Sequence, residues 1–233
     1  IDNLEEPLAI ELPSGNTLTL KPLIRQDDRV GVENFFPCAV LLNNDLSGGR
    51  PEILENIKQT LLPPLELGWA DRYKTEHFAH YSDVTNAFAE IIEIDPWLIT
   101  PTSIPCGPIN FKERTGLEEL AETVNKMLEE TANYYQTHDI GCKPFVIVKS
   151  DSGTYGMAIM SVNSAEDVLK LNRKQRNKMS SVKEGLQVEQ MLVQEGVYTY
   201  EEIEGAVAEP VVYMIGSQVM GGFYRVHTGK KAT

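Results

Sequence analysis

The stretch Val148-Lys149-Ser150-Asp151-Ser152-Gly153-Thr154-Tyr155-Gly156-Met157 connects two apolar runs, residues 144–149 and 157–162. Such runs on either side of a glycine-bearing loop predict the two strands of a hairpin. A lysine ammonium can neutralise phosphate oxygens there, and backbone N–H groups of the loop can hydrogen-bond them. The spacing matches neither a Walker loop nor a GxGxxG fingerprint. A plain hairpin turn explains the loop equally well.

The segments around this stretch predict an alternation of helices and strands. Thr115-Gly116-Leu117-Glu118 is a capping-box pattern, and apolar residues then recur at helical spacing as far as Tyr135. Another capping box at Ser164 begins a second predicted helix, and residues 190–197 predict a strand. Residues 211–215 and 219–226 predict a final hairpin in which Gly216 supplies the positive φ of the turn.

The N-terminal part predicts short strands and two helices. Residues 17–24 and 35–42 have the composition of strands, and the second is followed by a polar, turn-forming run, residues 43–50. Pro51 and the apolar residues after it predict a helix over residues 51–61. A further helix is predicted around residues 78–92.

Charge and cysteine content limit the possible partners. Lys plus Arg is 21 and Asp plus Glu is 34, which gives a net charge of −13. This balance argues against a general nucleic-acid or anionic membrane surface, and no apolar stretch approaches the roughly 20 residues of a membrane span. The three cysteines lack CxxC spacing, so neither a disulfide framework nor a zinc site is predicted. A reducing cytoplasm fits best.

Three segments together resemble the ATP-grasp superfamily in motif and order: the lysine strand with its glycine loop, residues 193–197, and the hairpin of residues 209–226. The resemblance implies an α/β, ATP-grasp-like fold that binds ATP. It implies that Lys149 contacts the phosphates and the adenine edge and that Arg225 lies by the transferred phosphoryl group, as the two catalytic residues. The implied flap over the phosphates is Ser152, Gly153, Thr154, Tyr155, Gly156 and Met157, and the implied adenine hinge is Gln194, Glu195, Gly196 and Val197.

A narrower resemblance extends over most of the chain. Residues 41–47, 67–78, 95–99 and 146–157 look like the proteobacterial-type glutamate–cysteine ligase family. That family joins the γ-carboxylate of L-glutamate to the amine of L-cysteine through an acyl phosphate, with ATP and Mg²⁺, in the first step of glutathione synthesis. An amino-acid substrate needs charged and polar partners, and the candidates are Asn43, Asn44, Asp45, Arg50 and Arg72. A plain turn and surface salt bridges are the alternatives for these residues.

The resemblance also predicts a domain organisation. An N-terminal α/β domain for the amino-acid substrate would comprise residues 1–112, a connecting helix residues 113–141, a lid subdomain residues 142–197, and the start of a C-terminal antiparallel sheet residues 198–233. No metal ligand is assigned, and ligands for Mg²⁺ are expected beyond Thr233, as in an incomplete chain. Two alternatives remain: an ATP-grasp-like nucleotide-binding module without metal-dependent catalysis, and an ATP-grasp ligase for another amino acid.

Overall fold

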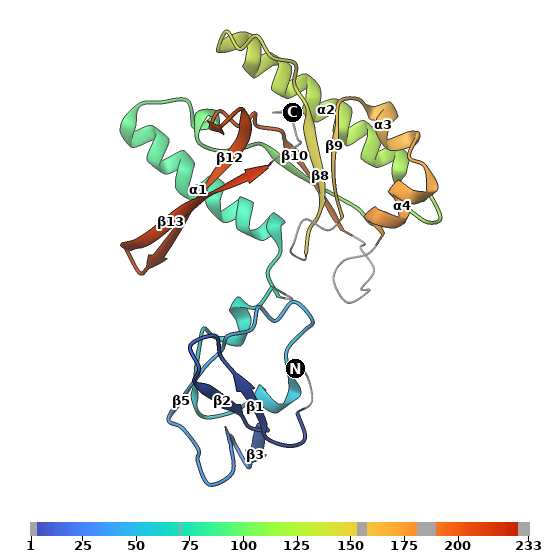
Figure 1. Cartoon of the computed structure of the whole chain (residues 1–233). Helices are drawn as coiled ribbons and strands as arrows, with labels where there is room; N and C mark the ends of the chain where they lie inside the picture. Colours follow the sequence, from blue (N-terminus) through green and yellow to red (C-terminus); the bar gives the residue numbers. More distant parts are fainter. Residues whose placement is uncertain (1–3, 70, 153–157, 181–189, 228–233) are drawn as a thin grey trace.

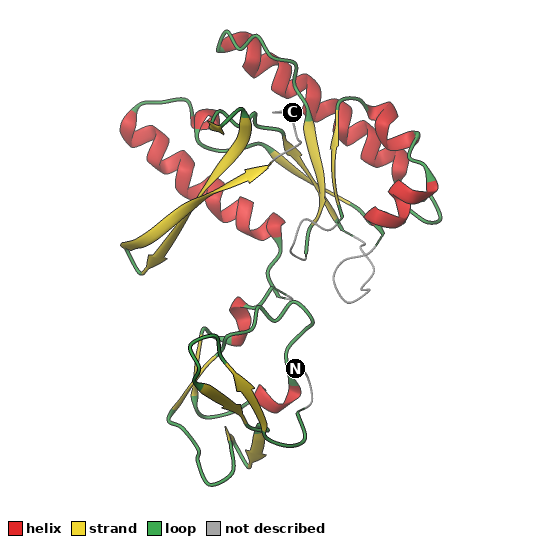
Figure 2. Cartoon of the chain, in the orientation of Figure 1, coloured by secondary structure: helices red, strands yellow, loops and turns green. Residues whose placement is uncertain are grey.

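A four-stranded antiparallel sheet forms the centre of the mixed α/β fold (Figures 1 and 2). The computed structural model describes residues 4–69, 71–152, 158–180 and 190–227. The sheet has the order β7-β10-β8-β9 and consists of β7 (Ser103–Cys106), β8 (Val146–Ser150), β9 (Ile159–Val162) and β10 (Met191–Glu195). The predicted hairpin and the predicted strand near residues 190–197 are therefore confirmed.

Helices cover one face of this sheet. Along β8 the side chains of Val146 and Val148 are buried, whereas those of Ile147 and Lys149 alternate with them on the opposite face. The helices are α2 (Leu117–Thr137), α3 (Ala165–Leu169) and α4 (Arg173–Met179), and Figure 1 shows them on the same side of the strands. Apolar residues of α2 at helical spacing fill the core with β8 and β10, among them Leu117, Leu120, Val124, Met127, Val148 and Val193.

The start of α2 differs from the prediction. Gly116 is the N-cap, and no side chain caps the helix there, so the capping box at Thr115 was wrong. The backbone of Thr115 instead forms a bridge with Asn110, with N···O distances of 3.1 and 3.2 Å. Gly116 has φ +74°, and a Cβ at this position would lie 2.7 Å from the carbonyl oxygen of Pro108. The second capping box is confirmed, since the Ser164 N–H donates to Asp167 Oδ2 at 3.0 Å.

Paired short strands make up most of the N-terminal part. Strand β1 (Leu8–Glu11) pairs with β2 (Thr17–Leu20), β3 (Ile24–Gln26) with β4 (Arg29–Gly31), and β5 (Ala39–Leu41) with β6 (Thr60–Leu62). The strand predicted over residues 17–24 is thus two strands, with Pro22 between them, because proline has no N–H for a ladder bond. The strand predicted over residues 35–42 is confirmed only as β5.

The helix predicted over residues 51–61 was wrong. The chain there forms a 3₁₀ turn, η1 (Glu52–Leu54), and then the strand β6. Asn56 has φ +55°, a left-handed conformation that interrupts a helix. Leu54 is nevertheless buried in a small core with Val30, Leu46 and Leu65, the last of which begins the 3₁₀ turn η2 (Leu65–Leu67). The apolar spacing correctly predicted burial but not the secondary structure.

The remaining elements are a long helix and a hairpin ribbon. Helix α1 (Lys74–Ile92) confirms the helix expected around residues 78–92 and leads into η3 (Pro96–Leu98). Strands β11 (Glu202–Ile203), β12 (Ala206–Ile215) and β13 (Gln218–His227) form a separate sheet, and Gly216 turns between the last two with φ +57°. Strand β7 belongs to the predicted domain of residues 1–112, and it pairs with β10, which belongs to the predicted lid subdomain. The domain boundaries remain predictions. No helix in the described ranges is both long and apolar enough to cross a membrane.

Candidate functional site

Lys149 lies on the sheet face that α2 leaves uncovered. Its Nζ donates a hydrogen bond to Oε1 of Gln194 on β10 and lies 4.8 Å from the ring centroid of Phe78 on α1. The side chain is half-buried, and burial first, then the nearby Lys74 ammonium, lowers the pKa of Lys149 to about 8. The predicted contacts of Lys149 with the phosphates and the adenine edge stay a prediction.

A second lysine, Lys74, approaches the same place from α1. Its Nζ donates to the backbone carbonyl of Asp151 at 3.3 Å. Burial lowers the pKa of Lys74, and the carboxylate of Asp151 partly opposes that shift. Sequence reasoning missed this residue, because 75 positions separate Lys74 from Lys149. Beyond the effect of burial, the Lys74 ammonium is near enough to lower the pKa of Lys149, and two ammonium groups of lowered pKa form a place where a polyanion would be stabilised.

Asp151 holds the first residues of the glycine-bearing loop in place. Its backbone carbonyl accepts a bond from the Lys74 N–H at 3.0 Å, and its side chain accepts bonds from Thr75. Ser152 follows in a bend and is half-buried. The other predicted flap residues, Gly153, Thr154, Tyr155, Gly156 and Met157, lie outside the described residues.

The predicted adenine hinge begins at the end of β10, the strand that pairs with β8 beside Lys149. The side chain of Gln194 faces Lys149, whereas Glu195 points the other way and is buried. The backbone N–H of Glu195 donates to the Thr102 carbonyl, and that of Gly196 to the Phe145 carbonyl, both at 2.9 Å. An adenine ring would therefore need other groups of this segment, since these two N–H groups are already bonded.

Gly196 and Val197 complete the hinge segment. A Cβ on Gly196 would lie 2.3 Å from the ring of Phe145, so the close approach of backbone and ring requires glycine. Val197 is exposed. The segment thus passes from a tightly packed strand to an accessible residue within three positions.

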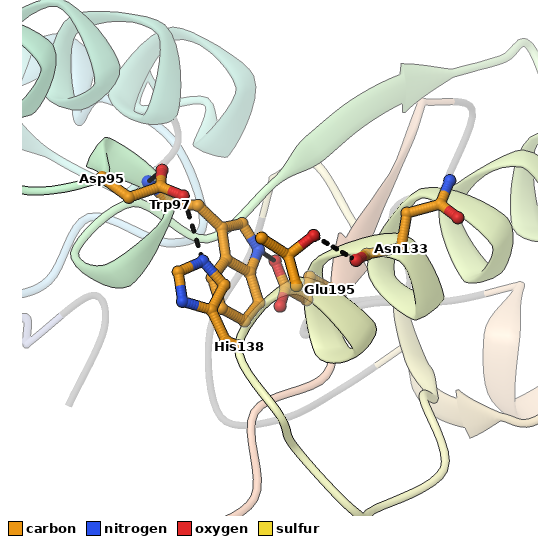
Figure 3. Close-up of polar contacts among 6 residues, drawn as sticks. Asp95, Trp97, Asn133, His138 and Glu195 are labelled. Carbon is orange, nitrogen blue, oxygen red and sulfur yellow. Dashed lines mark hydrogen bonds and ion pairs between the residues drawn. The ribbon is translucent and has the colours of Figure 1, made fainter.

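A polar and aromatic cluster, the Trp97 cluster, holds the end of β10 in place (Figure 3). Glu195 Oε2 accepts bonds from Trp97 Nε1 at 2.9 Å and from the Thr102 N–H at 3.2 Å. The Trp97 ring stacks on His138, with centroids 5.0 Å apart, and His138 Nε2 lies 3.0 Å from Asp95 Oδ2. Burial raises the pKa of Glu195, while the Trp97 N–H bond and then His138 lower the pKa of Asp95. No local sequence pattern predicts this cluster, because its members are up to 100 residues apart.

Arg225 lies on β13 directly opposite Glu209 of β12. The two side chains form an ion pair, with Arg225 Nε 3.1 Å from Glu209 Oε2, and the arginine side chain is 62% exposed. His227 Nε2 approaches the other carboxylate oxygen at 3.5 Å. The arginine guanidinium first, and His227 later, lower the pKa of Glu209. Arg225 is therefore already paired with a carboxylate.

A cavity of about 890 Å³ lies beside β8 and β9 and reaches Glu209 of β12. Ile147, two residues before Lys149, lines it from the sheet, and Glu209, the partner of Arg225, lines it from the hairpin. Lys170 and Lys178 lie on its rim from the side of α3 and α4. The volume is in the range of small-molecule sites.

The candidate amino-acid-binding residues of the N-terminal part make structural contacts. Asn44 Oδ1 accepts the Leu46 N–H at 2.8 Å, and Asp45 Oδ1 accepts the Ser47 N–H at 3.0 Å, which are turn-forming bonds. Asn43 beside them is exposed.

The two candidate arginines are also engaged. Arg50 pairs with Asp71 at 2.7 Å and with Glu66 at 3.5 Å, and the Asp71 bond first raises the pKa of Arg50. The Arg72 guanidinium lies 5.2 Å from the centroid of the Trp69 ring. The contacts of Arg50 match the salt-bridge alternative, whereas Arg72 contacts an aromatic ring, and a role of the five candidates in substrate binding stays a prediction.

Comparison with known proteins places the chain in a family. The glutamate-cysteine ligase family model matches residues 1–233. A 1.90 Å crystal structure from Methylobacillus flagellatus KT, of a protein provisionally named gamma-glutamylcysteine synthetase, is 51% identical in sequence with a TM-score of 0.87. The match covers 99% of this chain and 55% of that one, so this chain spans about half the length of that relative. No curated protein matches the chain. Because the family model extends over every residue, the chain belongs to the glutamate-cysteine ligase family.

Proposed function

We propose that this protein catalyses the ATP-dependent joining of the γ-carboxylate of L-glutamate to the amine of L-cysteine, the first step of glutathione synthesis. The observation that carries the proposal is the half-buried lysine pair, Lys74 and Lys149, at the root of the loop after β8. Bound polyphosphate would offset the cost of burying these two ammonium groups and the repulsion of Lys149 by Lys74. Family membership indicates the reaction in which such a site is used.

The chemistry explains why a ligase needs these cations. A carboxylate and an amine do not condense at neutral pH, and ATP supplies the phosphoryl group that converts the carboxylate into an acyl phosphate. Lys149 and Lys74 would bind the phosphate oxygens and offset negative charge as it shifts in the transition state. The cysteine amine then attacks the acyl carbon, the amide C–N bond forms, and phosphate leaves with the electron pair of the C–O bond.

The finer, ATP-grasp-like arrangement is part of the proposal. The nucleotide would lie between the face of β8–β10 that carries Lys149 and the β12–β13 hairpin, with adenine at residues 194–197 and residues 152–157 over the phosphates. The cavity shared by Ile147 and Glu209 supports this arrangement. Arg225 would reach the transferred phosphoryl group by exchanging its bond with Glu209 for phosphate oxygens. The five candidates of the N-terminal part would bind the amino acid through groups that their turn and salt-bridge contacts leave accessible.

Magnesium and compartment complete the proposal. Within the described ranges, no group of three or more His, Cys, Asp or Glu side chains could hold a metal ion. These residues do not by themselves fit a Mg²⁺ site, and we assign no step to the ion.

The cysteines bear on the compartment. Cys38, Cys106 and Cys142 are all free thiols, which supports a reducing compartment such as the cytoplasm.

The test is ADP release by the intact natural protein with L-glutamate, L-cysteine, ATP and Mg²⁺, leaving out each in turn. We expect ADP release to require both amino acids and to match the amount of γ-glutamylcysteine formed. Turnover that ignores glutamate would refute the substrate assignment. ATP binding without turnover would instead favour the nucleotide-binding module.

A further inference from the structure

Asp151 is a buried carboxylate that caps a helix far away in the sequence. It follows β8 directly and is 6% exposed. Its Oδ1 accepts the Thr75 N–H at 2.8 Å, and its Oδ2 accepts the Thr75 hydroxyl, also at 2.8 Å. The N-cap residue of α1 itself, Tyr73, makes no side-chain capping bond. Both oxygens of Asp151 therefore bind the first turn of α1, where a negative charge is stabilised by the helix dipole.

The backbone of Asp151 also connects segments that are far apart in the sequence. Its carbonyl accepts the Lys74 N–H at 3.0 Å, and its own N–H donates to the Gln190 carbonyl at 3.0 Å. The start of α1, the end of β8 and the residue before β10 thus meet at one residue. A residue with both backbone and side chain engaged in this way fixes the relative position of the elements it joins.

The orientation of α1 decides where two groups around Lys149 lie. Lys74 and Phe78 are four residues apart and therefore lie on the same face of the helix. The Phe78 ring centroid is 4.8 Å from Lys149 Nζ, and Lys74 Nζ is 3.3 Å from the Asp151 carbonyl oxygen. A shift of the first turn of α1 would move both groups away from Lys149 together.

We propose that Asp151 is a positioning residue for the lysine pair: by holding the first turn of α1 against the end of β8, it places the Lys74 ammonium and the Phe78 ring beside Lys149. The inference rests on the proposed function in one respect, namely that the pair binds the polyphosphate of ATP. The placement itself is a property of the free protein and can be measured without nucleotide.

Two variants test this role, and a third is the matched control. Asp151→Asn keeps the size of the side chain but removes its charge and one acceptor. Thr75→Val removes the hydroxyl donor and leaves Asp151 charged. Asn110→Ala is the control, because Asn110 Oδ1 also accepts two backbone N–H bonds, from Lys112 at 3.0 Å and Glu113 at 3.1 Å, but in the turn that precedes α2.

The first readout is the pKa of Lys149, measured by NMR of the ¹³C-methylated protein. The titratable group that acts on it is Lys74 on α1, whose own pKa burial lowers and the Asp151 carboxylate raises, and the uncharged Gln194 and Phe78 contact its ammonium. Loosening α1 lets water in and moves Lys74 away, so we expect the pKa to rise from about 8 toward 10.5 in both test variants and to stay in place in the control.

The second readout is ATP affinity by calorimetry. We expect about tenfold weaker binding in Asp151→Asn and a smaller loss in Thr75→Val, since one charge-assisted phosphate contact is worth about one to two powers of ten. The control should bind like the wild type.

The outcomes separate this inference from the proposed function. An unchanged Lys149 pKa in both test variants, with only the melting temperature lowered, would show that Asp151 is merely structural and would overturn the inference. A wild type that binds no ATP would refute the proposed function, while the pKa readout would still decide the role of Asp151. If Asp151→Asn does not fold, the Lys149 pKa and the ATP affinity of Thr75→Val decide the role of Asp151. Equal effects in the control would also overturn the inference.

Discussion

The two residues predicted to be catalytic lie in contrasting surroundings. Lys149 is half-buried on a sheet that α2 supports from behind, and its neighbours are an amide oxygen, an aromatic ring and a second lysine. Arg225 is largely exposed on a two-stranded ribbon and forms an ion pair with Glu209. Both carry the positive charge that a phosphate needs. Burial and a neighbouring ammonium lower the pKa of the first and so disfavour its charged form, whereas the second is already paired with a carboxylate and screened by solvent.

The same contrast holds for the apolar side chains. The core between α2 and the sheet excludes water around residues such as Leu120 and Val193. The outer part of the β12–β13 ribbon exposes Val212, Met214 and Ile215 instead. A two-stranded ribbon has little apolar surface to bury by itself. The stability of the described protein should therefore come from the sheet region rather than from the ribbon.

The largest expected effect tests that statement. Leu120→Ala removes a side chain that is 0% exposed, and we expect it to lower the free energy of unfolding by about 2–5 kcal/mol. Val212→Ala truncates a side chain that is 56% exposed and should change the free energy of unfolding by less than about 0.5 kcal/mol. Urea unfolding followed by circular dichroism measures both. Similar losses in the two variants would remove the distinction between the regions.

The next effect tests the two cations. Lys149→Met should weaken ATP binding by about 10- to 100-fold, because a hydrogen bond to a charged group contributes roughly 1.5–3 kcal/mol. Arg225→Met should weaken it by less than about threefold, since an exposed, already paired cation contributes little to ground-state binding. Lys126→Met is the control, because Lys126 lies on the exposed side of α2 in a weak pair with Glu130. Calorimetry on the three variants decides, and a larger loss for Arg225→Met would reverse the comparison.

Elements with a strong local pattern could be predicted from the sequence. The apolar runs of β8 and β9 on either side of a glycine-bearing loop, the helical spacing of α2 and the turn glycine Gly216 each specify their structure within a few residues. The helix predicted over residues 51–61 fails because its apolar positions fit a turn and a strand equally well. A distant contact decides between them: Gln59 Nε2 donates to the Val30 carbonyl at 2.8 Å, which ties this segment to β4.

The candidate site was predictable only in part, for a similar reason. Lys149 stands next to a recognisable loop, so its own neighbourhood in the sequence pointed to it. Lys74 and Thr75 become neighbours of Lys149 and Asp151 only after the chain has folded. Asn44 and Asp45 show the opposite difficulty, since residues that suit a ligand also suit a turn: here they form turn bonds, and their role in substrate binding stays a prediction. Local patterns identify residue types, and tertiary contacts select among their uses.

The smallest expected effect is the part of the pH dependence that Lys149 contributes, which a comparison with Lys149 variants isolates. As pH rises through about 8, its ammonium loses a proton, so ATP affinity should fall several-fold between pH 7 and pH 9. Lys149→Arg keeps its charge and should show a flatter profile of ATP affinity against pH.

The stability of the protein should change with pH in the opposite direction to the ATP affinity. The pKa of Lys149 lies below its ordinary value of 10.5, so between pH 8 and 10.5 the unfolded chain binds more protons, and the free energy of unfolding relative to Lys149→Met should rise with pH. Calorimetry and urea unfolding at pH 7, 8 and 9 measure the two trends. Opposite signs would identify one buried lysine as the source of both, whereas parallel trends would show that its burial is not what makes it different from Arg225.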